Sequence, residues 1–198
     1  MKLSIINKGM NYDTYRAHIQ SLLTENKTTG SKQIPELVEF TQLNEQRMHR
    51  NEKQFKLNEE LSETLSSKKS KEYWVLFAEA WCGDCAQNIP IINKIAEASN
   101  GTIELKILIK SEHLNEFQHY LTNGAESIPK LIRFDTETLE EIGVWGPRPL
   151  NAQAIAEYWK KNKATQTKEE FEKELHLWYA KDKGQTLQNE ISNLLKVT

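Results

Sequence analysis

Two cysteines, Cys82 and Cys85, are the residues of this 198-residue chain best suited to chemistry, and they lie three positions apart in Trp81-Cys82-Gly83-Asp84-Cys85. The apolar run at residues 73–78 directly before them predicts a buried strand, and the residues after them predict a helix. Peptide amides at a helix start are unpaired and carry partial positive charge, so they favour a thiolate over a thiol at Cys82. The pattern therefore predicts thiol–disulfide redox chemistry.

A metal half-site and a structural disulfide without catalytic use are the alternatives for this pair. Zinc needs about four ligands, and the chain has no second cysteine pair. His113 and His119 follow in a later predicted helix and would have to converge on the cysteines by chance. A reducing compartment favours a catalytic or metal-binding pair over a structural disulfide. We therefore expect redox chemistry and no metal ligands.

The composition is that of a soluble globular domain, with 38% hydrophobic residues, 27% charged residues and a net charge of -2. Acidic and basic residues are interleaved, as at residues 168–174, which indicates a solvated helix face rather than a surface that tracks phosphates. No apolar run is long enough to span a bilayer, and the apolar stretch at residues 3–6 is too short for a signal peptide. We expect a cytoplasmic protein that binds neither nucleic acid nor membrane.

The order of predicted elements indicates an α/β fold. The first part of the chain is helical and polar, and the apolar period changes at residue 73. Helices are predicted at 11–23, 35–66 (as one or two), 83–99, 111–121, 151–161, 168–181 and 185–197, and strands at 73–79, 103–109, 131–134 and 140–145. We expect the first two strands to be parallel and the last two to form an antiparallel hairpin.

Four features together give the chain a resemblance to a known family. They are the Cys-x-x-Cys corner, Pro90 five residues after Cys85, Ile128-Pro129 before the hairpin, and the order of elements. With them, residues 73–161 resemble the thioredoxin superfamily, and the added helices resemble an uncharacterised bacterial branch of it. The resemblance implies three α/β/α layers around a central four-stranded mixed sheet. The predicted parts are a helical extension packed on the core (1–70), a thioredoxin-like domain (71–163) and C-terminal helices (164–198), together in one compact unit.

The resemblance also implies roles for individual residues. Cys82 corresponds to the exposed nucleophile, Cys85 to the buried resolving thiol, Trp81 to the aromatic rim and Pro129 to the family's cis-proline. A cis bond at this proline would leave the backbone groups of Ile128 free to pair with an extended substrate. Cys82 would attack a target disulfide and Cys85 would resolve the mixed disulfide, so that no cofactor is implied beyond the redox-active disulfide of Cys82 and Cys85.

Two positions depart from the family pattern. Asp84 stands where the best-known thioredoxins have proline, and its carboxylate opposes a thiolate at Cys82 but also interacts well with a helix start. Leu76 stands where many members have a buried aspartate. Glu79 is a poor replacement, because an odd offset along a strand points to the opposite face. The proton that resolves the mixed disulfide would then come from water or another group.

The segment at residues 143–149 follows the last predicted strand and is expected at the same end of the sheet as the cysteines. Trp145 and Arg148 would then line a substrate groove; the alternative is a stiff proline-rich connection with Arg148 in solvent. The predicted substrate-binding residues are Trp81, Gly83, Asp84, Ile128, Pro129, Trp145 and Arg148.

The run at residues 47–50 is either a partner or substrate surface beside the active site or a stretch in which Met48 packs and the charges face water. Helical spacing favours a core position for Trp159, Trp178 and Tyr179.

The sequence favours a cytoplasmic disulfide reductase that acts on protein or small-molecule disulfides. An electron donor, which the sequence does not identify, would reduce it again. The charge of Asp84 and a reducing compartment favour a reductant over an oxidant. The rival hypothesis is a binding module with the same fold, in which the cysteines act as a redox switch for a partner that docks on the added helices.

Overall fold

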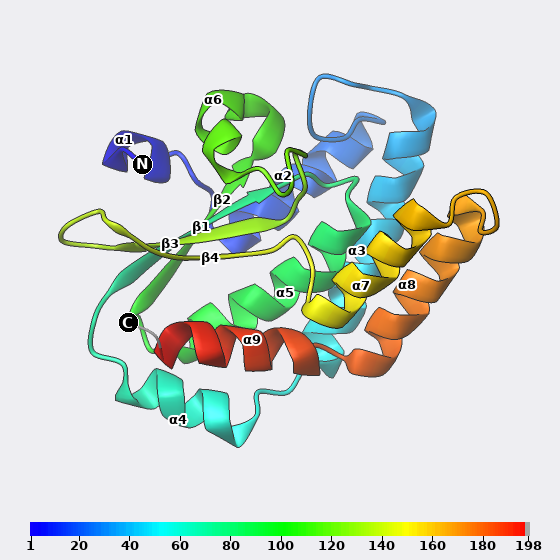
Figure 1. Ribbon diagram of the computed structural model, residues 1–198. Coiled ribbons are helices and arrows are strands. Elements are labelled where there is room, and N and C mark those ends of the chain that lie inside the picture. The colour runs from blue at the N-terminus through cyan, green and yellow to red at the C-terminus, as the bar shows by residue number, and fades with distance from the viewer. Residues whose placement is uncertain (197–198) are drawn as a thin grey trace.

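Within residues 1–196, which the computed structural model describes, four strands form one mixed sheet (Figure 1). They are β1 (Glu72–Ala78), β2 (Ile103–Ile109), β3 (Lys130–Asp135) and β4 (Glu141–Trp145), in the spatial order β2-β1-β3-β4. β1 and β2 are parallel, whereas β3 is antiparallel to both β1 and β4. The predicted parallel pair and hairpin are confirmed.

The register of the sheet decides which loops meet. Phe77 pairs with Lys130, so the end of β1 lies beside the start of β3, and Leu131 pairs with Trp145 near the end of β4. The Cys-x-x-Cys corner, the segment before β3 and the loop after β4 therefore converge at one edge of the sheet. This edge carries the candidate site.

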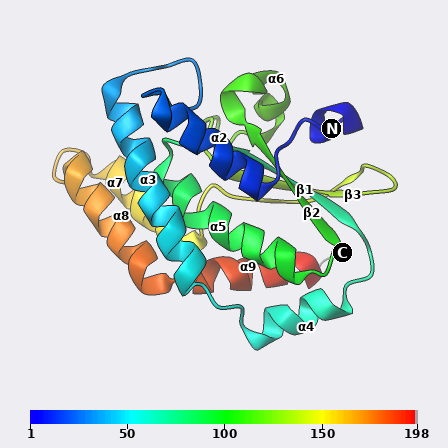
Figure 2. The same cartoon turned by 180° about the vertical axis from the view of Figure 1, so that it is seen from behind.

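Helix α5 (Gly83–Ala98) starts at the cysteine corner and is buried along most of its length. It lies with α9 (Gln185–Lys196) on one face of the sheet, while α6 (Leu114–Phe117) lies on the other, as the views in Figures 1 and 2 show. The helix stops at Asn100 and Gly101, whose φ angles of 53° and 84° are left-handed, as their residue types predict. This arrangement gives the expected three layers.

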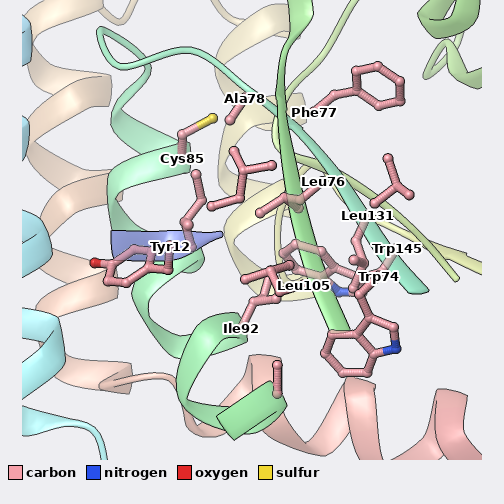
Figure 3. Close-up of a cluster of buried hydrophobic side chains, with 14 of the residues drawn as sticks. Tyr12, Trp74, Leu76, Phe77, Ala78, Cys85, Ile92, Leu105, Leu131 and Trp145 are labelled. Atoms are coloured by element: carbon pink, nitrogen blue, oxygen red, sulfur yellow. The ribbon is translucent and has the colours of Figure 1, made fainter. Parts of the chain in front are cut away.

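The core between the sheet and α5 is made of apolar side chains (Figure 3). Trp74 and Leu76 on β1 are fully buried and face α5, and Cys85 lies at the edge of the same cluster. Leu76 therefore contributes packing to this face, as an apolar residue on a central strand should.

The helical region before β1 contains α1 (Leu3–Ile6), α2 (Tyr12–Thr24), α3 (Pro35–Gln54) and α4 (Glu59–Ser67). The stretch predicted as one or two helices at 35–66 is two, because the backbone becomes extended at Phe55 and the side chain of Asn58 accepts from the Leu61 amide at 2.8 Å to cap α4. Before α2, Met10 forms an isolated antiparallel bridge with Ile107 of β2.

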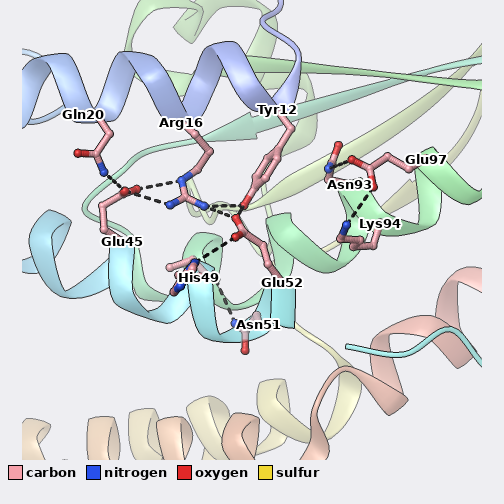
Figure 4. A network of polar contacts seen from close by, with 11 residues as sticks. Tyr12, Arg16, Gln20, Glu45, His49, Asn51, Glu52, Asn93, Lys94 and Glu97 are labelled. Atoms are coloured by element: carbon pink, nitrogen blue, oxygen red, sulfur yellow. Dashed lines mark hydrogen bonds and ion pairs between the residues drawn. The ribbon is translucent and has the colours of Figure 1, made fainter. Parts of the chain in front are cut away.

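A polar network joins α2 to α3 (Figure 4). Arg16 donates to both carboxylate oxygens of Glu45, from Nε at 3.1 Å and from Nη2 at 3.0 Å. The hydroxyl of Tyr12 donates to Glu52 at 2.5 Å, and Arg16 also pairs with Glu52. Because both carboxylates belong to α3, the network fixes the rotation of that helix against the rest of the molecule.

The C-terminal part consists of α7 (Leu150–Lys161), α8 (Lys168–Asp182) and α9. The ring of Trp159 stacks on Phe171 with centroids 4.6 Å apart, so Trp159, predicted as a core residue, is partly buried against a small cluster between α7 and α8. The turn from α8 to α9 runs through Lys183 and Gly184 with positive φ, and a Cβ on Gly184 would lie 2.6 Å from Ile91. Position 197, in the last predicted helix, lies outside the described residues.

The helix predicted at 111–121 is wrong. Two short 3₁₀ turns, Lys110–Glu112 and Gln118–Tyr120, flank the four-residue α6. His113 interrupts the helix with φ -134° and ψ 39°. Tertiary packing overrides the local pattern here, since Phe117 is fully buried against Phe77 with ring centroids 5.2 Å apart.

A buried ion pair lies at the end of the sheet away from the cysteines. Arg133 donates from Nε and Nη2 to the two carboxylate oxygens of Glu72, both at 2.8 Å, and Trp74 Nε1 donates to the same carboxylate at 2.8 Å. Lys68 pairs with Glu72 as well, and Arg133 also donates to the Leu194 carbonyl of α9. The cluster thereby ties the last helix to the central strands.

Candidate active site

Cys82 is the N-cap residue of α5, with extended backbone at φ -79° and ψ 119°. Its side chain is half-buried and lines a pocket of about 360 Å³. Cys85 lies one turn further along the helix and is 1% exposed. Both thiols are free. Ligands that enter the pocket therefore meet the sulfur of Cys82 and not that of Cys85.

The two thiols interact with each other. Burial raises the pKa of Cys85 well above its usual value, and a hydrogen bond with Cys82 raises it further, while a backbone hydrogen bond from Glu79 lowers it. Cys85 is consequently protonated at neutral pH. The pair combines an accessible sulfur with a buried thiol in contact with it.

The segment before β3 places a backbone carbonyl, that of Ile128, beside Cys82. The peptide bond between Ile128 and Pro129 is cis, and the carbonyl of Ile128 accepts from Cys82 Sγ at 3.5 Å. Ile128 is 6% exposed and Pro129 is also buried. The Ile128 carbonyl therefore contacts the first thiol, in a place with little access for another chain.

Asp84 does not cap the helix start but is buried against residues from the C-terminal part of the chain. Its side chain is buried, and Oδ2 pairs with Arg148 Nη2 at 2.5 Å while Oδ1 accepts from the Tyr179 hydroxyl at 2.9 Å. Burial raises the pKa of Asp84, and the charge of Arg148 and the hydrogen bonds from Arg148 and Tyr179 oppose that rise. The carboxylate beside the helix start thus has its charge balanced by Arg148.

The loop after β4 reaches the cysteine corner through Arg148, which lines the pocket. The structure does not bring Trp145 there. Trp145 is 7% exposed and donates from Nε1 to Glu190 of α9 at 2.7 Å. Because it pairs with Leu131 inside the sheet, its side chain lies under α9, so its predicted place in the groove is corrected.

Gly83 is where two other helices come closest to the cysteine corner. A Cβ on Gly83 would lie 3.1 Å from Cε1 of His176 on α8 and 3.4 Å from Nη1 of Arg47 on α3. Burial, together with the charges of Arg47 and Arg50, lowers the pKa of His176 to about 4, so its imidazole is neutral at physiological pH. The absence of a side chain at position 83 lets both helices approach Cys82.

His176 was missed from the sequence, Tyr179 was predicted only as a core residue, and Arg47 was named only within the run 47–50, in the hypothesis of a substrate surface beside the active site. Met48 is buried, as one interpretation of the run 47–50 required, but its neighbour Arg47 lines the pocket instead of facing open water. Tyr179 is buried, as predicted, and bonds to Asp84. Positions 172, 175, 176 and 179 have the spacing of one helix face, and this pattern could have indicated that α8 turns these residues toward the rest of the protein.

Trp81 separates the pocket from a second hollow of about 270 Å³. Glu79, which lines the second hollow, is fully buried and accepts from the Ser111 amide at 2.8 Å. No three side chains among histidine, cysteine, aspartate and glutamate gather as metal ligands in residues 1–196. The chemistry that this edge of the sheet can do is that of the two thiols.

Comparisons with known proteins give the family. A family model described as thioredoxin matches residues 30–163, more than half of the chain. The chain therefore belongs to the thioredoxin family.

Two solved structures share the fold. A protein of unknown function from Pseudomonas aeruginosa aligns with a TM-score of 0.60 and 17% identity over 100% of this chain and 96% of that one. An HIV epitope scaffold aligns with a TM-score of 0.56 and 18% identity over 98% of this chain and 94% of that one. No curated protein matches. In the described part of the chain, no helix combines the length and apolar character needed to cross a membrane.

Proposed function

We propose that this protein is a thiol–disulfide oxidoreductase, acting as a disulfide reductase in the cytoplasm. The observation that carries the proposal is the asymmetry of the two thiols: Cys82 is at the start of α5 on a pocket, and Cys85 is buried behind it in hydrogen-bond contact. Thiol exchange needs one sulfur that a substrate can reach and a second one that only the first can reach.

The reaction consumes both thiols. The Cys82 thiolate attacks one sulfur of a disulfide, so that a Cys82–substrate S–S bond forms and the first substrate thiolate leaves with the electron pair of the broken bond. Cys85 then attacks Cys82, which forms the Cys82–Cys85 disulfide and releases the second substrate thiolate. The two protons of the cysteine thiols end on the two substrate thiols. An external dithiol then returns two electrons and two protons to the protein.

The surroundings support this sequence of steps. The sulfur of Cys82 lies at the positive end of the α5 dipole, and Arg148 balances the nearby charge of Asp84. The high pKa of Cys85 keeps the second thiol protonated until the mixed disulfide has formed. Trp81 forms the rim beside the attacking sulfur.

Trapping with cysteine variants tests the proposal. The Cys85→Ser protein should accumulate a mixed disulfide at Cys82 with a disulfide probe such as bis(2-hydroxyethyl) disulfide, detected by intact-mass spectrometry and reversed by dithiothreitol. The Cys82→Ser protein should form no adduct at neutral pH and should lose at least about a thousandfold in turnover, because the remaining thiol is buried and protonated. Equal adduct formation in both variants would refute the assignment of roles.

A further inference from the structure

We propose that the substrate is a low-molecular-weight disulfide with a carboxylate close to its sulfur, and that Arg47 binds this carboxylate. The proposal rests on the thiol–disulfide function above and adds the substrate class. It follows from the walls of the pocket at Cys82, from the pairing of the charges in it, and from the position of Arg47 over Gly83.

The walls of the pocket limit the size of the substrate. Segments from both ends of the chain line it, including Phe40 of α3 and Phe171 of α8, and its volume of about 360 Å³ is in the range of small-ligand sites. The backbone beside Cys82 offers little to an extended polypeptide, since Ile128 is 6% exposed and its carbonyl already accepts from the thiol. A small molecule fits this site better than a segment of folded protein.

Most charges that line the pocket are neutralised within it. Arg148 pairs with Asp84 at 2.5 Å, and Lys168 pairs with Glu172 at 3.4 Å. Lys32 and Glu36 also line the pocket, and both are exposed, which places them at the solvent side. Among the described residues, Arg47 is the cation inside the pocket that forms no ion pair with a carboxylate.

Arg47 is held in place by a neutral group. Its Nη1 donates to Asn44 Oδ1 at 2.9 Å, and Asn44 in turn donates from Nδ2 to the Ala80 carbonyl at 2.8 Å. Within residues 1–196, no carboxylate oxygen lies within 4.0 Å of its guanidinium. Burial and the charge of Arg50 lower the pKa of Arg47, and the more distant charges of Glu172 and Asp84 oppose this without forming an ion pair with it. A partly desolvated guanidinium with a fixed direction and free donors is an anion-binding group.

The position of this guanidinium relates it to the reacting sulfur. Nη1 of Arg47 lies 3.4 Å from the place of a Cβ on Gly83, the residue directly after the nucleophile. A carboxylate that pairs with Arg47 would therefore belong to a molecule whose disulfide lies against Cys82. Charge pairing of this kind orients the disulfide for attack and adds to kcat/KM.

The test uses three disulfides of similar size that differ in charge: 3,3′-dithiodipropionate, bis(2-hydroxyethyl) disulfide and cystamine, with insulin as a protein disulfide. Single-turnover oxidation of the reduced full-length protein gives kcat/KM for each. The wild type should reduce the dicarboxylate about tenfold faster than the neutral disulfide at 50 mM salt, and the preference should shrink at 500 mM salt. Cystamine and insulin should react more slowly than either.

Matched variants separate Arg47 from general charge effects. Arg47→Gln should bring the ratio of dicarboxylate to neutral rates close to one, and Arg47→Lys should keep part of it. Arg50→Gln removes the same charge one turn further along α3, where the side chain bonds to Gln87 outside the pocket, and should retain the preference. A preference that survives Arg47→Gln, a wild type that favours cystamine, or faster reduction of insulin would overturn the inference while leaving the proposed function standing. Failure to reduce any of the four disulfides would overturn both.

Discussion

Two carboxylate–arginine pairs at opposite ends of the sheet have similar chemistry and different surroundings. Glu72 and Arg133 have side chains that are 0% exposed, whereas those of Asp84 and Arg148 are 8% and 18% exposed. Burial raises the pKa of both carboxyl groups, yet the pKa of Glu72 is lowered overall because Arg133, Lys68 and Trp74 all bond to it. With fewer donors, the pKa of Asp84 is raised overall.

The difference shows what decides the state of a buried carboxylate. Burial penalises the charged form in both places, and the number of donors determines whether this penalty is overcome. At the Glu72 end the donors come from the sheet and the preceding loop, and Arg133 carries the connection on to α9. At the Asp84 end they come from Arg148 and α8, so the charge beside Cys82 depends on segments outside the sheet. The first pair connects the sheet to α9, and the second lies beside Cys82 in the candidate active site.

The largest effect is expected from Arg133→Met. The substitution leaves Glu72 buried without its bidentate partner and should reduce the free energy of unfolding by about 3–5 kcal/mol. The rate of disulfide reduction per folded molecule should be nearly unchanged, since this end of the sheet is away from Cys82. Urea denaturation and an activity assay on the folded fraction measure the two quantities. The double variant Glu72→Gln/Arg133→Met should recover part of the loss, and a greater loss in the double variant would contradict the pairing.

The same change at the other end of the sheet, Arg148→Met, should affect the reactivity of Cys82 more than the stability of the protein. Because the Arg148 side chain is partly exposed, we expect a loss of only about 1–2 kcal/mol in stability. The unbalanced charge of Asp84 should slow alkylation of Cys82 by iodoacetamide about tenfold at pH 8, which corresponds to about 1.4 kcal/mol. Adding Asp84→Asn should restore the rate. An equal rate in the single and double variants would show that Arg148 does not act through Asp84.

The smallest effect is a difference in pH dependence between the two ends. The pKa of His176 is about 4 in the folded protein against 6.5 in a free side chain, so the unfolded chain takes up the proton first. Stability that is present above pH 6.5 should therefore be lost as the pH falls toward 4, by about 1–2 kcal/mol once the full shift is reduced for the partial solvent exposure of the side chain. The contribution of Glu72, whose pKa is lowered, is lost only below about pH 4.5.

Urea titrations between pH 7 and 4 on the wild type and on His176→Gln measure this effect. The difference between the two proteins isolates His176 from Asp84, whose raised pKa acts with the opposite sign as the pH falls. The variant should lose less stability over the range. Parallel curves would mean that His176 is protonated as readily in the folded protein as in the unfolded chain.

Much of the fold could be predicted from the sequence because its signals are local. The apolar run before Cys82, the left-handed stop at Asn100-Gly101 and the period of the C-terminal helices each depend on neighbouring residues only. The helix predicted at 111–121 failed where one buried contact, between Phe117 and Phe77, outweighed local propensity.

The site was less predictable, because its charges are paired across long distances in the sequence. Asp84 binds partners 64 and 95 residues further along the chain, which no local pattern indicates. Arg47 faces the pocket because the polar network between α2 and α3 sets the rotation of α3. Trp145 lies at the predicted end of the sheet, but its place in β4 beside Leu131 directs its side chain toward α9 instead of the pocket.

The contact between Tyr179 and Asp84 has a consequence for the order in which the molecule is completed. A ribosome makes the chain from the first residue to the last, and all strands of the sheet precede residue 146. Until α8 has emerged and folded back, nothing from the last fifty residues shields Cys82, and Asp84 lacks its hydroxyl donor. The newly made chain thus contains both sulfurs and the α3 side of the pocket well before it contains the α8 side.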